Sequence, residues 1–250
     1  MYIVDKFYSK IWTKDVKICF WKSIIEFILC RDYIARSNIL KWVLKHANKM
    51  SGKLLDIWCW KKPYEKIFHN VEQYIWIDVE VSWHDHSTSC VDVFYDWENI
   101  PFPNENFDCV FSTQVFEHVE NIEKVMKESN RVLKKWWYVL VSMPFVWPEH
   151  EKPYDFRRWT TFWIKKNFKL MWFDVIDLKK STSDVLAIWS LFLSYLVSIL
   201  PFYNRRKVFT VFWQLILITP LMCLIYLFNF LLPNKWDLFL DNIVLAKKIK

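Results

Sequence analysis

Glycine is almost absent from this sequence, with a single residue, Gly52, among 250. At the average usage of about 7%, a chain of this length would contain roughly 18 glycines. Tryptophan occurs 17 times, so the shortage of glycine is close to the total number of tryptophans. Glycine normally supplies the turns that need a positive φ or a close approach of the backbone to a ligand. As written, the sequence lacks the residue on which such turns depend.

Three further absences narrow the class of protein. The six cysteines form no C-x-x-C pair, and three lie in or beside predicted core strands, so we expect buried, reduced thiols in a cytosolic domain. The N-terminus has no early apolar segment and does not predict a cleaved signal peptide. The net charge of +7 comes without an arginine-rich or aromatic-interleaved nucleic-acid motif. That charge favours an anionic membrane surface or an anionic substrate over nucleic acid as a partner.

The segment 53–63 is the most informative stretch. A short apolar run from Leu54 to Ile57 predicts a buried strand that stops abruptly. A tight turn into a helix should follow, which is the geometry with which a parallel sheet holds a nucleotide at its carboxyl edge. Trp58 and Trp60 occupy the two places where that turn normally has glycine.

This stretch resembles the first motif of class I S-adenosylmethionine-dependent methyltransferases, in which a strand is followed by Asp-hydrophobic-Gly-Cys-Gly and a helix. Asp56 and Cys59 match that motif, whereas Trp58 and Trp60 stand in place of its two glycines. The resemblance implies that residues 56–60 hold the methionine part of S-adenosyl-L-methionine.

Other tryptophans also stand where turn chemistry favours glycine, namely Trp76, Trp97, Trp136 and Trp137. We hypothesise that many tryptophans of this sequence are glycines in the natural protein. A gene that uses UGA as a glycine codon, translated with a table that reads UGA as tryptophan, would give this pattern. The alternative is a protein that is truly rich in tryptophan and poor in glycine.

Two more acids follow in the order that this family has. The run 73–78 predicts a second strand, and Asp78 at its end, some 20 residues after the turn, can accept both hydroxyls of a ribose. Residues 92–112 resemble the methyltransferase-11 type, with an acid-small-Glu-x-Leu-Pro-Phe loop, then Phe-Asp and an apolar strand. The resemblance implies that Asp96 meets the adenine amino group and that the backbone of Trp97 lies against the adenine ring.

After that strand the chain crosses the carboxyl edge of the sheet, below the expected methyl group. We expect Thr113 and Gln114 to contact the cofactor there. The family often has a Glu-His pair at this place, here Glu117 and His118. His118 could orient a ligand or take a proton, since imidazole titrates near neutral pH, or it could cap or pack the next helix.

A long loop follows the next predicted strand, and a similar run recurs in methyltransferases that resemble this chain. We interpret it as a lid on the acceptor side. His150 is a candidate base, and Asp155, also a candidate catalytic residue, could position the acceptor with Tyr154. Arg157 and Arg158 could bind an anionic group such as phosphate. The alternative is a loop that is held by its own salt bridges.

No metal site is predicted. His84 and His86 have i, i+2 spacing but no third ligand nearby, so they fit a polar loop better than a metal centre.

The composition changes near residue 183. Residues 185–200 are nearly uncharged, and 208–232 carry no charge over a length that could span a bilayer. If 238–246 completes the sheet, a spanning hairpin would place the basic cluster 205–207 outside, against the positive-inside tendency. The pattern therefore favours a hairpin that dips into the cytoplasmic leaflet and attaches the protein to the inner face of the membrane. The alternative is a helix pair that covers the sheet or a dimer partner.

The fold predicted from these features is α/β and Rossmann-like. It has about seven mostly parallel strands, helices on both faces, an antiparallel last strand and an added apolar hairpin. Four parts are expected: an N-terminal helical extension (1–50), a cofactor-binding core (51–182), the hydrophobic hairpin (183–234) and the last strand (235–250).

The predicted activity is methyl transfer from S-adenosyl-L-methionine to a small-molecule or lipid-linked acceptor. The sulfonium carries an activated methyl group, so the protein mainly has to align a nucleophile and exclude water. Two other classes stay open. If the tryptophans are real, the chain could be an inactive membrane-attached scaffold. A dinucleotide-dependent oxidoreductase would need a small residue where Pro63 stands.

Overall fold

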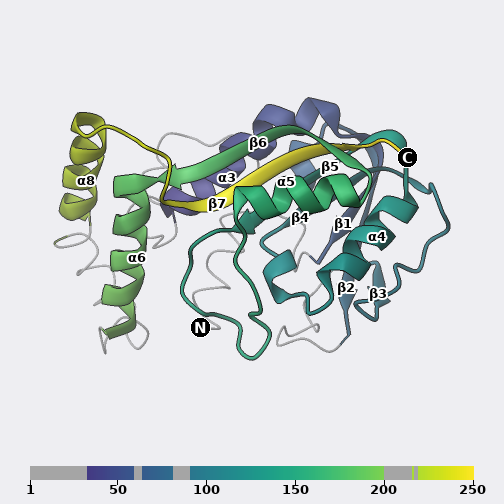
Figure 1. Cartoon of the computed structure of the whole chain (residues 1–250), viewed down its shortest axis with the longest axis horizontal. Coiled ribbons are helices and arrows are strands. Elements are labelled where there is room, and N and C mark those ends of the chain that lie inside the picture. The colour runs from purple at the N-terminus through teal and green to yellow at the C-terminus, as the bar shows by residue number, and fades with distance from the viewer. Residues whose placement is uncertain (1–32, 59–63, 81–90, 200–215, 217–218) are drawn as a thin grey trace. The chain divides into compact units, whose positions relative to one another are not determined.

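The computed structural model describes residues 33–58, 64–80, 91–199, 216 and 219–250 (Figure 1). These residues fall into two compact units. The core unit comprises the described parts of Lys41–Phe145, Glu149–Lys179 and Asp241–Lys250. The helical unit comprises the described parts of Met1–Leu40, Val146–Pro148 and Lys180–Leu240.

The centre of the fold is a seven-stranded sheet with the order β3-β2-β1-β4-β5-β7-β6. The pairs β1–β2, β1–β4, β2–β3 and β4–β5 are parallel, and β7 runs antiparallel to β5. The strands are β1 Ser51–Ile57, β2 Asn70–Val79, β3 Val93–Tyr95, β4 Phe107–Thr113, β5 Leu133–Pro144, β6 Phe173–Ser183 and β7 Phe239–Lys248. The predicted Rossmann-like fold with an antiparallel last strand is confirmed.

The central strands read as continuous apolar runs because parallel strands are covered on both faces. Leu54, Leu55 and Ile57 of β1 are fully buried, as are Phe107 and Val110 of β4. Each such side chain contributes about 1.5–3 kcal/mol relative to an exposed one. These buried side chains hold the parallel strands in register, and the loops that follow the strands therefore lie at the same edge of the sheet.

Two helices of the core unit begin at side-chain caps. The helix α4, Ile122–Val132, starts at Asn121, whose side chain accepts from the amide of Lys124. The helix α5, Thr161–Leu170, starts at Thr160, whose hydroxyl accepts from the amide of Trp163. The remaining elements of this unit are η1 Ala47–Lys49, η2 Glu65–Ile67, η4 Phe116–His118 and the C-terminal part of α3 Tyr33–His46.

Two helical segments of the core unit are short. The helix α4 ends at Val132, because Leu133 already pairs with Phe107 at the start of β5. Of the helix expected after the bend, the described residues 64–69 contain only the turn η2. There Phe68 packs edge-on against Phe111, at 5.0 Å between ring centroids, just before β2 begins.

The helical unit contains α6 Asp184–Ile199 and α8 Thr219–Leu231. Trp189 and Leu193 of α6 pack with Met222 of α8 and with Ile34. Both helices also expose large apolar side chains. Within the described residues, no helix has the length and apolar character needed to cross a bilayer. The rest of the predicted hairpin, residues 200–215, 217 and 218, lies outside the described residues.

Positive φ angles are concentrated at tryptophan. Ten described residues other than glycine have a positive φ, and five of them are Trp58, Trp97, Trp136, Trp172 and Trp236, with angles between 57° and 71°. Bulky side chains rarely adopt this conformation. The single glycine, Gly52, has φ +68°, and a Cβ there would lie 2.6 Å from a carboxylate oxygen of Asp108. Five tryptophans therefore have the same left-handed backbone conformation as the one glycine.

Candidate active site

A hollow of about 660 Å³ opens at the carboxyl ends of β2 and β3, the edge at which open α/β sheets bind ligands. Apolar and polar groups alternate along its wall, which suits a ligand with a flat ring and polar edges. The hollow is lined by Val79, Glu80, Phe94, Tyr95, Asp96, Trp97, Asn99 and Pro101.

Asp78 is a buried acid that directly precedes Val79, one of the residues that line the hollow. Its Oδ1 accepts from the amide of Val79 at 2.7 Å, while Oδ2 has no hydrogen-bond partner among the described residues. Burial raises the pKa of Asp78 to about 7. Because ribose hydroxyls are donors, a nucleoside would supply the bonds that this carboxylate lacks. The ribose contact of Asp78 stays a prediction, since Asp78 itself is not among the residues that line the hollow.

Asp96 lines the hollow and is held rigidly by its own loop. Its Oδ1 accepts from the amides of Asn99, at 2.7 Å, and Glu98, at 2.9 Å, and Oδ2 accepts from the side-chain amide of Asn99. These bonds lower the pKa of Asp96, so the side chain is an ionised acceptor. An oriented acceptor at this place fits an exocyclic amino group of a base.

Asp56 is fixed within the sheet. It is almost fully buried, and the hydroxyl of Tyr74 on β2 donates to its Oδ2. This hydrogen bond links β1 to β2 two residues before the bend at Trp58. In the described structure Asp56 therefore stabilises the strand end. The next predicted residues, Cys59 and Trp60, lie outside the described residues.

The indole of Trp58 fills space at the bend. The side chain is 7% exposed, and its ring contacts that of Trp97, at 4.8 Å between centroids, and that of His118, at 5.1 Å. Trp97 belongs to the predicted adenine loop, and His118 follows β4 at the predicted methyl end. As written, Trp58 therefore bridges the two ends of the expected cofactor site.

Thr113 and Gln114 stand at the end of β4. Thr113 is the last residue of that strand, opposite Ser142 of β5. Gln114 has φ 55° and uses its amide and side chain to bond the carbonyl and hydroxyl of Ser142. These bonds of Gln114 therefore tie the segment that follows β4 to Ser142 of β5.

His118 has a fixed orientation below this edge. Its Nδ1 lies 2.8 Å from the carbonyl oxygen of Tyr154, and its Nε2 lies 3.1 Å from a carboxylate oxygen of Glu151. Burial lowers the pKa of His118 to about 4, so the imidazole is neutral near pH 7. A neutral, oriented imidazole of this kind can accept a proton or bind a cation.

Asp155 organises the lid loop. It accepts from the backbone amide of His150 at 2.9 Å and makes a bidentate ion pair with Arg158. Although burial acts to raise it, these bonds lower the pKa of Asp155 to about 2. The same carboxylate lies 3.3 Å from Nδ1 of His150. The pair of Asp155 and Arg158 therefore supports the interpretation of a loop held by its own salt bridge.

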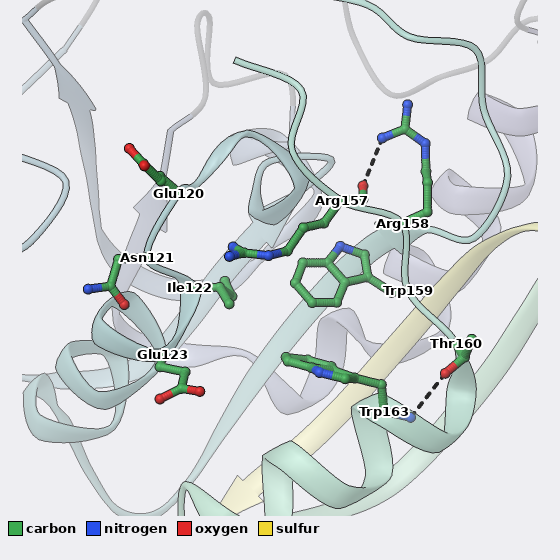
Figure 2. A pocket seen from close by; sticks show the side chains of 9 residues that line it. All are labelled: Glu120, Asn121, Ile122, Glu123, Arg157, Arg158, Trp159, Thr160 and Trp163. Carbon is green, nitrogen blue, oxygen red and sulfur yellow. Dashed lines mark hydrogen bonds between the residues drawn. The ribbon is translucent and has the colours of Figure 1, made fainter. Parts of the chain in front are cut away.

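Arg157 faces a different hollow, of about 440 Å³ (Figure 2). Its Nη1 donates to the carbonyl oxygen of Val119 at 2.8 Å, and Figure 2 shows its guanidinium directed toward the turn before α4 while Arg158 points away. Trp159 and Trp163 form a second wall, with 4.4 Å between ring centroids. The lining residues are Glu120, Asn121, Ile122, Glu123, Arg157, Arg158, Trp159, Thr160 and Trp163.

Two acids at the site have no role in the sequence-based assignment. Glu117 is fully buried, and Glu151 contacts His118. The sequence pattern that could have pointed to Glu117 is its position in the Glu-His pair that the family often has. Glu151 has no signal beyond lying in a polar loop, because its contact with His118 crosses 33 positions of the chain.

Residues 73–139 match a family model described as a methyltransferase domain, and that segment contains Asp78 and Asp96. No curated protein sequence gives a significant match to the chain.

Solved structures with a similar fold include the [4+2]-cyclase SpnF, which is 15% identical, with a TM-score of 0.53 over 85% of this chain and 81% of that one. An S-adenosylmethionine-dependent methyltransferase from Mesorhizobium loti is 10% identical, with a TM-score of 0.50 over 88% and 98% of the two chains. Phospholethanolamine N-methyltransferase 2 from Haemonchus contortus, solved with S-adenosylhomocysteine, is 15% identical, with a TM-score of 0.53 over 86% of this chain and 53% of that one.

At such identities the structural likeness shows the fold alone, and one of these proteins is a cyclase, so fold does not decide the reaction. The match to the family model adds the sequence evidence. The predicted resemblance to methyltransferases of the methyltransferase-11 type is confirmed for residues 73–139.

The buried acid of β2 gives a first testable prediction. Since burial raises the pKa of Asp78 above its unfolded value, the stability that the protonated acid contributes is lost as pH rises toward 7. We expect Asp78→Asn to raise the free energy of unfolding at pH 8 by up to about 4 kcal/mol, and by much less at pH 4, since one pKa unit corresponds to about 1.4 kcal/mol. Urea unfolding at the two pH values measures this difference.

The matched control is Asp174→Asn, which removes an exposed acid of β6. Equal effects of the two substitutions at both pH values would contradict the buried, uncompensated state of Asp78.

Proposed function

We propose that this methyltransferase domain transfers the methyl group of S-adenosyl-L-methionine to an anionic or hydroxyl-bearing acceptor that is presented at a membrane surface. The observation that carries the proposal is the buried Oδ2 of Asp78, which has no hydrogen-bond partner among the described residues and precedes Val79, a lining residue of the hollow that Asp96 also lines. Both acids lie within the segment that matches the family. Asp78 would hold the ribose, Asp96 the adenine, and residues 56–60 the methionine part. Bound there, the cofactor supplies an activated methyl group.

The residues of the chain supply orientation and proton transfer. In the proposed site, His118 or His150 accepts the proton of a hydroxyl acceptor, since a poorly ionised hydroxyl is a weak nucleophile. Asp155 positions His150 through its bond to the backbone amide and its contact with Nδ1. Tyr154, which is 37% exposed, contacts the acceptor from the lid.

Arg157 is the better candidate for an anionic group of the acceptor. Its guanidinium lines a hollow, whereas both terminal nitrogens of Arg158 bond the carboxylate of Asp155. An arginine in such a bidentate pair is already neutralised. We therefore assign the acceptor contact to Arg157 and a supporting role to Arg158.

The proposal includes glycine at several positions written as tryptophan. Trp58, Trp97 and Trp136, which the sequence singled out, all have positive φ, and two further tryptophans share this conformation. Trp76 and Trp137 lie within strands instead. At position 58 a hydrogen side chain would remove the indole that joins the adenine loop to His118. An alternative codon assignment explains both the strain and the filled site.

Peptide mass spectrometry of the natural protein tests the codon assignment. We expect peptides that cover residues 54–60 to contain glycine at positions 58 and 60. Tryptophan at both positions would contradict the assignment and would favour a scaffold without catalysis.

Ligand binding tests the site itself. We expect S-adenosylhomocysteine to bind the double variant Trp58→Gly, Trp60→Gly at least about tenfold more tightly than the chain as written, because the space of the Trp58 indole becomes available. Isothermal titration calorimetry measures both affinities.

The control is the double variant Trp136→Gly, Trp172→Gly. It relieves positive φ at two exposed tryptophans away from the hollow and should leave the affinity unchanged. Absence of binding to the first double variant would support the scaffold, and binding of NADH instead would support an oxidoreductase.

Attachment to a membrane is supported by the helical unit. The exposed side chains of α6 and α8 include Ile188, Tyr195, Phe230 and Leu231, which are 58%, 59%, 84% and 64% exposed. Single exposed apolar residues are common in soluble proteins, but so many on two neighbouring helices favour an apolar partner. The net charge of +7 would add attraction to anionic headgroups. A lipid-linked acceptor would then be delivered from the same surface.

Vesicle binding tests this attachment. We expect Ile188→Glu with Phe230→Glu to weaken co-sedimentation with anionic phospholipid vesicles at least about tenfold, since each buried apolar side chain contributes about 1.5–3 kcal/mol. Phe162→Glu is the control, because Phe162 is 82% exposed on α5 of the core unit. Unchanged vesicle binding together with a loss of self-association would assign the surface to a dimer.

A further inference from the structure

Two histidines and a buried acid meet below the edge of the sheet. Glu117 and His118 belong to η4, and His150 comes from the lid loop. One ligand atom of each lies within 4.8 Å of the other two. Because 32 positions separate the two histidines, only the tertiary fold brings these residues together.

Glu117 is a buried acid without a hydrogen bond from the described residues, although the charge of Arg158 acts to stabilise its ionised form. Its side chain is 0% exposed, and neither carboxylate oxygen has a hydrogen-bond partner among the described residues. An isolated buried carboxylate costs several kcal/mol unless it is protonated or compensated by a cation. The side chain therefore needs either a proton or a positive charge.

The orientation of His118 bears on whether a proton or a cation compensates Glu117. The carbonyl oxygen of Tyr154 can only accept, so Nδ1 of His118 carries the proton and, in the neutral ring, Nε2 carries a lone pair. That Nε2 lies 3.1 Å from a carboxylate oxygen of Glu151 and 3.9 Å from Oε1 of Glu117. A lone pair that faces two carboxylates is repulsive unless a cation or a proton lies between them.

His150 is held in the manner of a metal ligand. Its ring lies 4.8 Å from that of His118, and its Nδ1 lies 3.3 Å from Oδ2 of Asp155. Metal-binding histidines typically use one ring nitrogen for a carboxylate or a backbone carbonyl and the other for the ion. His150 has the first arrangement, with the carboxylate of Asp155. His118 has the second, with the backbone carbonyl of Tyr154.

We propose that Glu117, His118 and His150 form a binding site for a divalent transition-metal ion such as Zn²⁺, with Glu151 as a fourth ligand. Imidazole and carboxylate donors suit Zn²⁺ or Fe²⁺, whereas Mg²⁺ prefers oxygen ligands alone. Bonds of about 2.1 Å in a tetrahedral site place ligand atoms about 3.4 Å apart, so ligand atoms that now lie within 4.8 Å of one another have to approach by up to about 1.4 Å. Movement of the lid loop that carries His150 and Glu151 would provide this contraction.

The site would change the roles of both histidines. Once they bind an ion, they no longer serve as bases, and the ion itself can bind an oxygen of the acceptor and stabilise its negative charge. A bound ion would thus replace the base role that the proposed function gives to these histidines. The metal site can nevertheless be tested separately, because metal binding is measured without cofactor or acceptor.

Calorimetric titration of the metal-free full chain with ZnCl₂ tests the proposal. We expect one Zn²⁺ per chain, with affinity lowered at least about 100-fold in both Glu117→Gln and His150→Ala, and about tenfold in Glu151→Gln. Glu117→Gln keeps the size of the side chain and removes a buried charge, so the fold should be retained. His69→Ala is the control, since His69 is an exposed histidine outside the cluster and its replacement should leave binding unchanged.

Three results would overturn the metal site. Wild-type affinity in Glu117→Gln and His150→Ala would place the bound Zn²⁺ elsewhere. Absence of Zn²⁺ binding to the wild-type chain would leave a protonated Glu117 as the explanation of the cluster. Tighter binding of Mg²⁺ than of Zn²⁺ would contradict the proposed use of two imidazoles. None of these results bears on the binding of S-adenosylhomocysteine.

Discussion

The bend at the end of β1 is the constraint on which the site depends. The amide of Trp58 still donates to the carbonyl of Ile77, at 2.8 Å, so the residue remains part of the sheet edge while its φ turns positive. A positive φ is the conformation that glycine adopts most readily at such a bend. Whichever side chain occupies position 58 therefore decides whether the space between the adenine loop and His118 is open or filled.

Near this bend lie buried acids that the described part of the chain does not satisfy. Within it, one carboxylate oxygen of Asp78 and both of Glu117 have no hydrogen-bond partner, and both side chains are 0% exposed. Such groups reduce stability, and natural proteins tolerate them mainly where a ligand or an ion completes the bonding. The carboxylate of Asp155 shows the contrast, because Arg158 and the amide of His150 satisfy it from within the loop.

The sequence by itself determined the architecture and the order of the acids. Apolar runs such as Leu54–Ile57 mark strands that are buried on both faces, and the caps Asn121 and Thr160 mark where helices begin. Asp78 follows from its place at the end of a strand, since parallel strands bring their carboxyl ends to one edge. The positive φ at Trp58, Trp97 and Trp136 likewise agrees with what turn chemistry predicted. All of these signals are local, and local patterns can be read along the chain.

Only the tertiary structure decided which side chains meet. The partnership of Arg158 with Asp155, which separates its role from that of Arg157, depends on rotamers that no spacing reveals. The approach of His150 and Glu151 to the Glu117-His118 pair depends on how the lid loop folds back over η4. The shortened helices likewise reflect competition with strand pairing at Leu133 and aromatic packing at Phe68. Apart from the pair of Asp155 and Arg158, these contacts join residues far apart in sequence, so their energies depend on distances that only the folded chain sets.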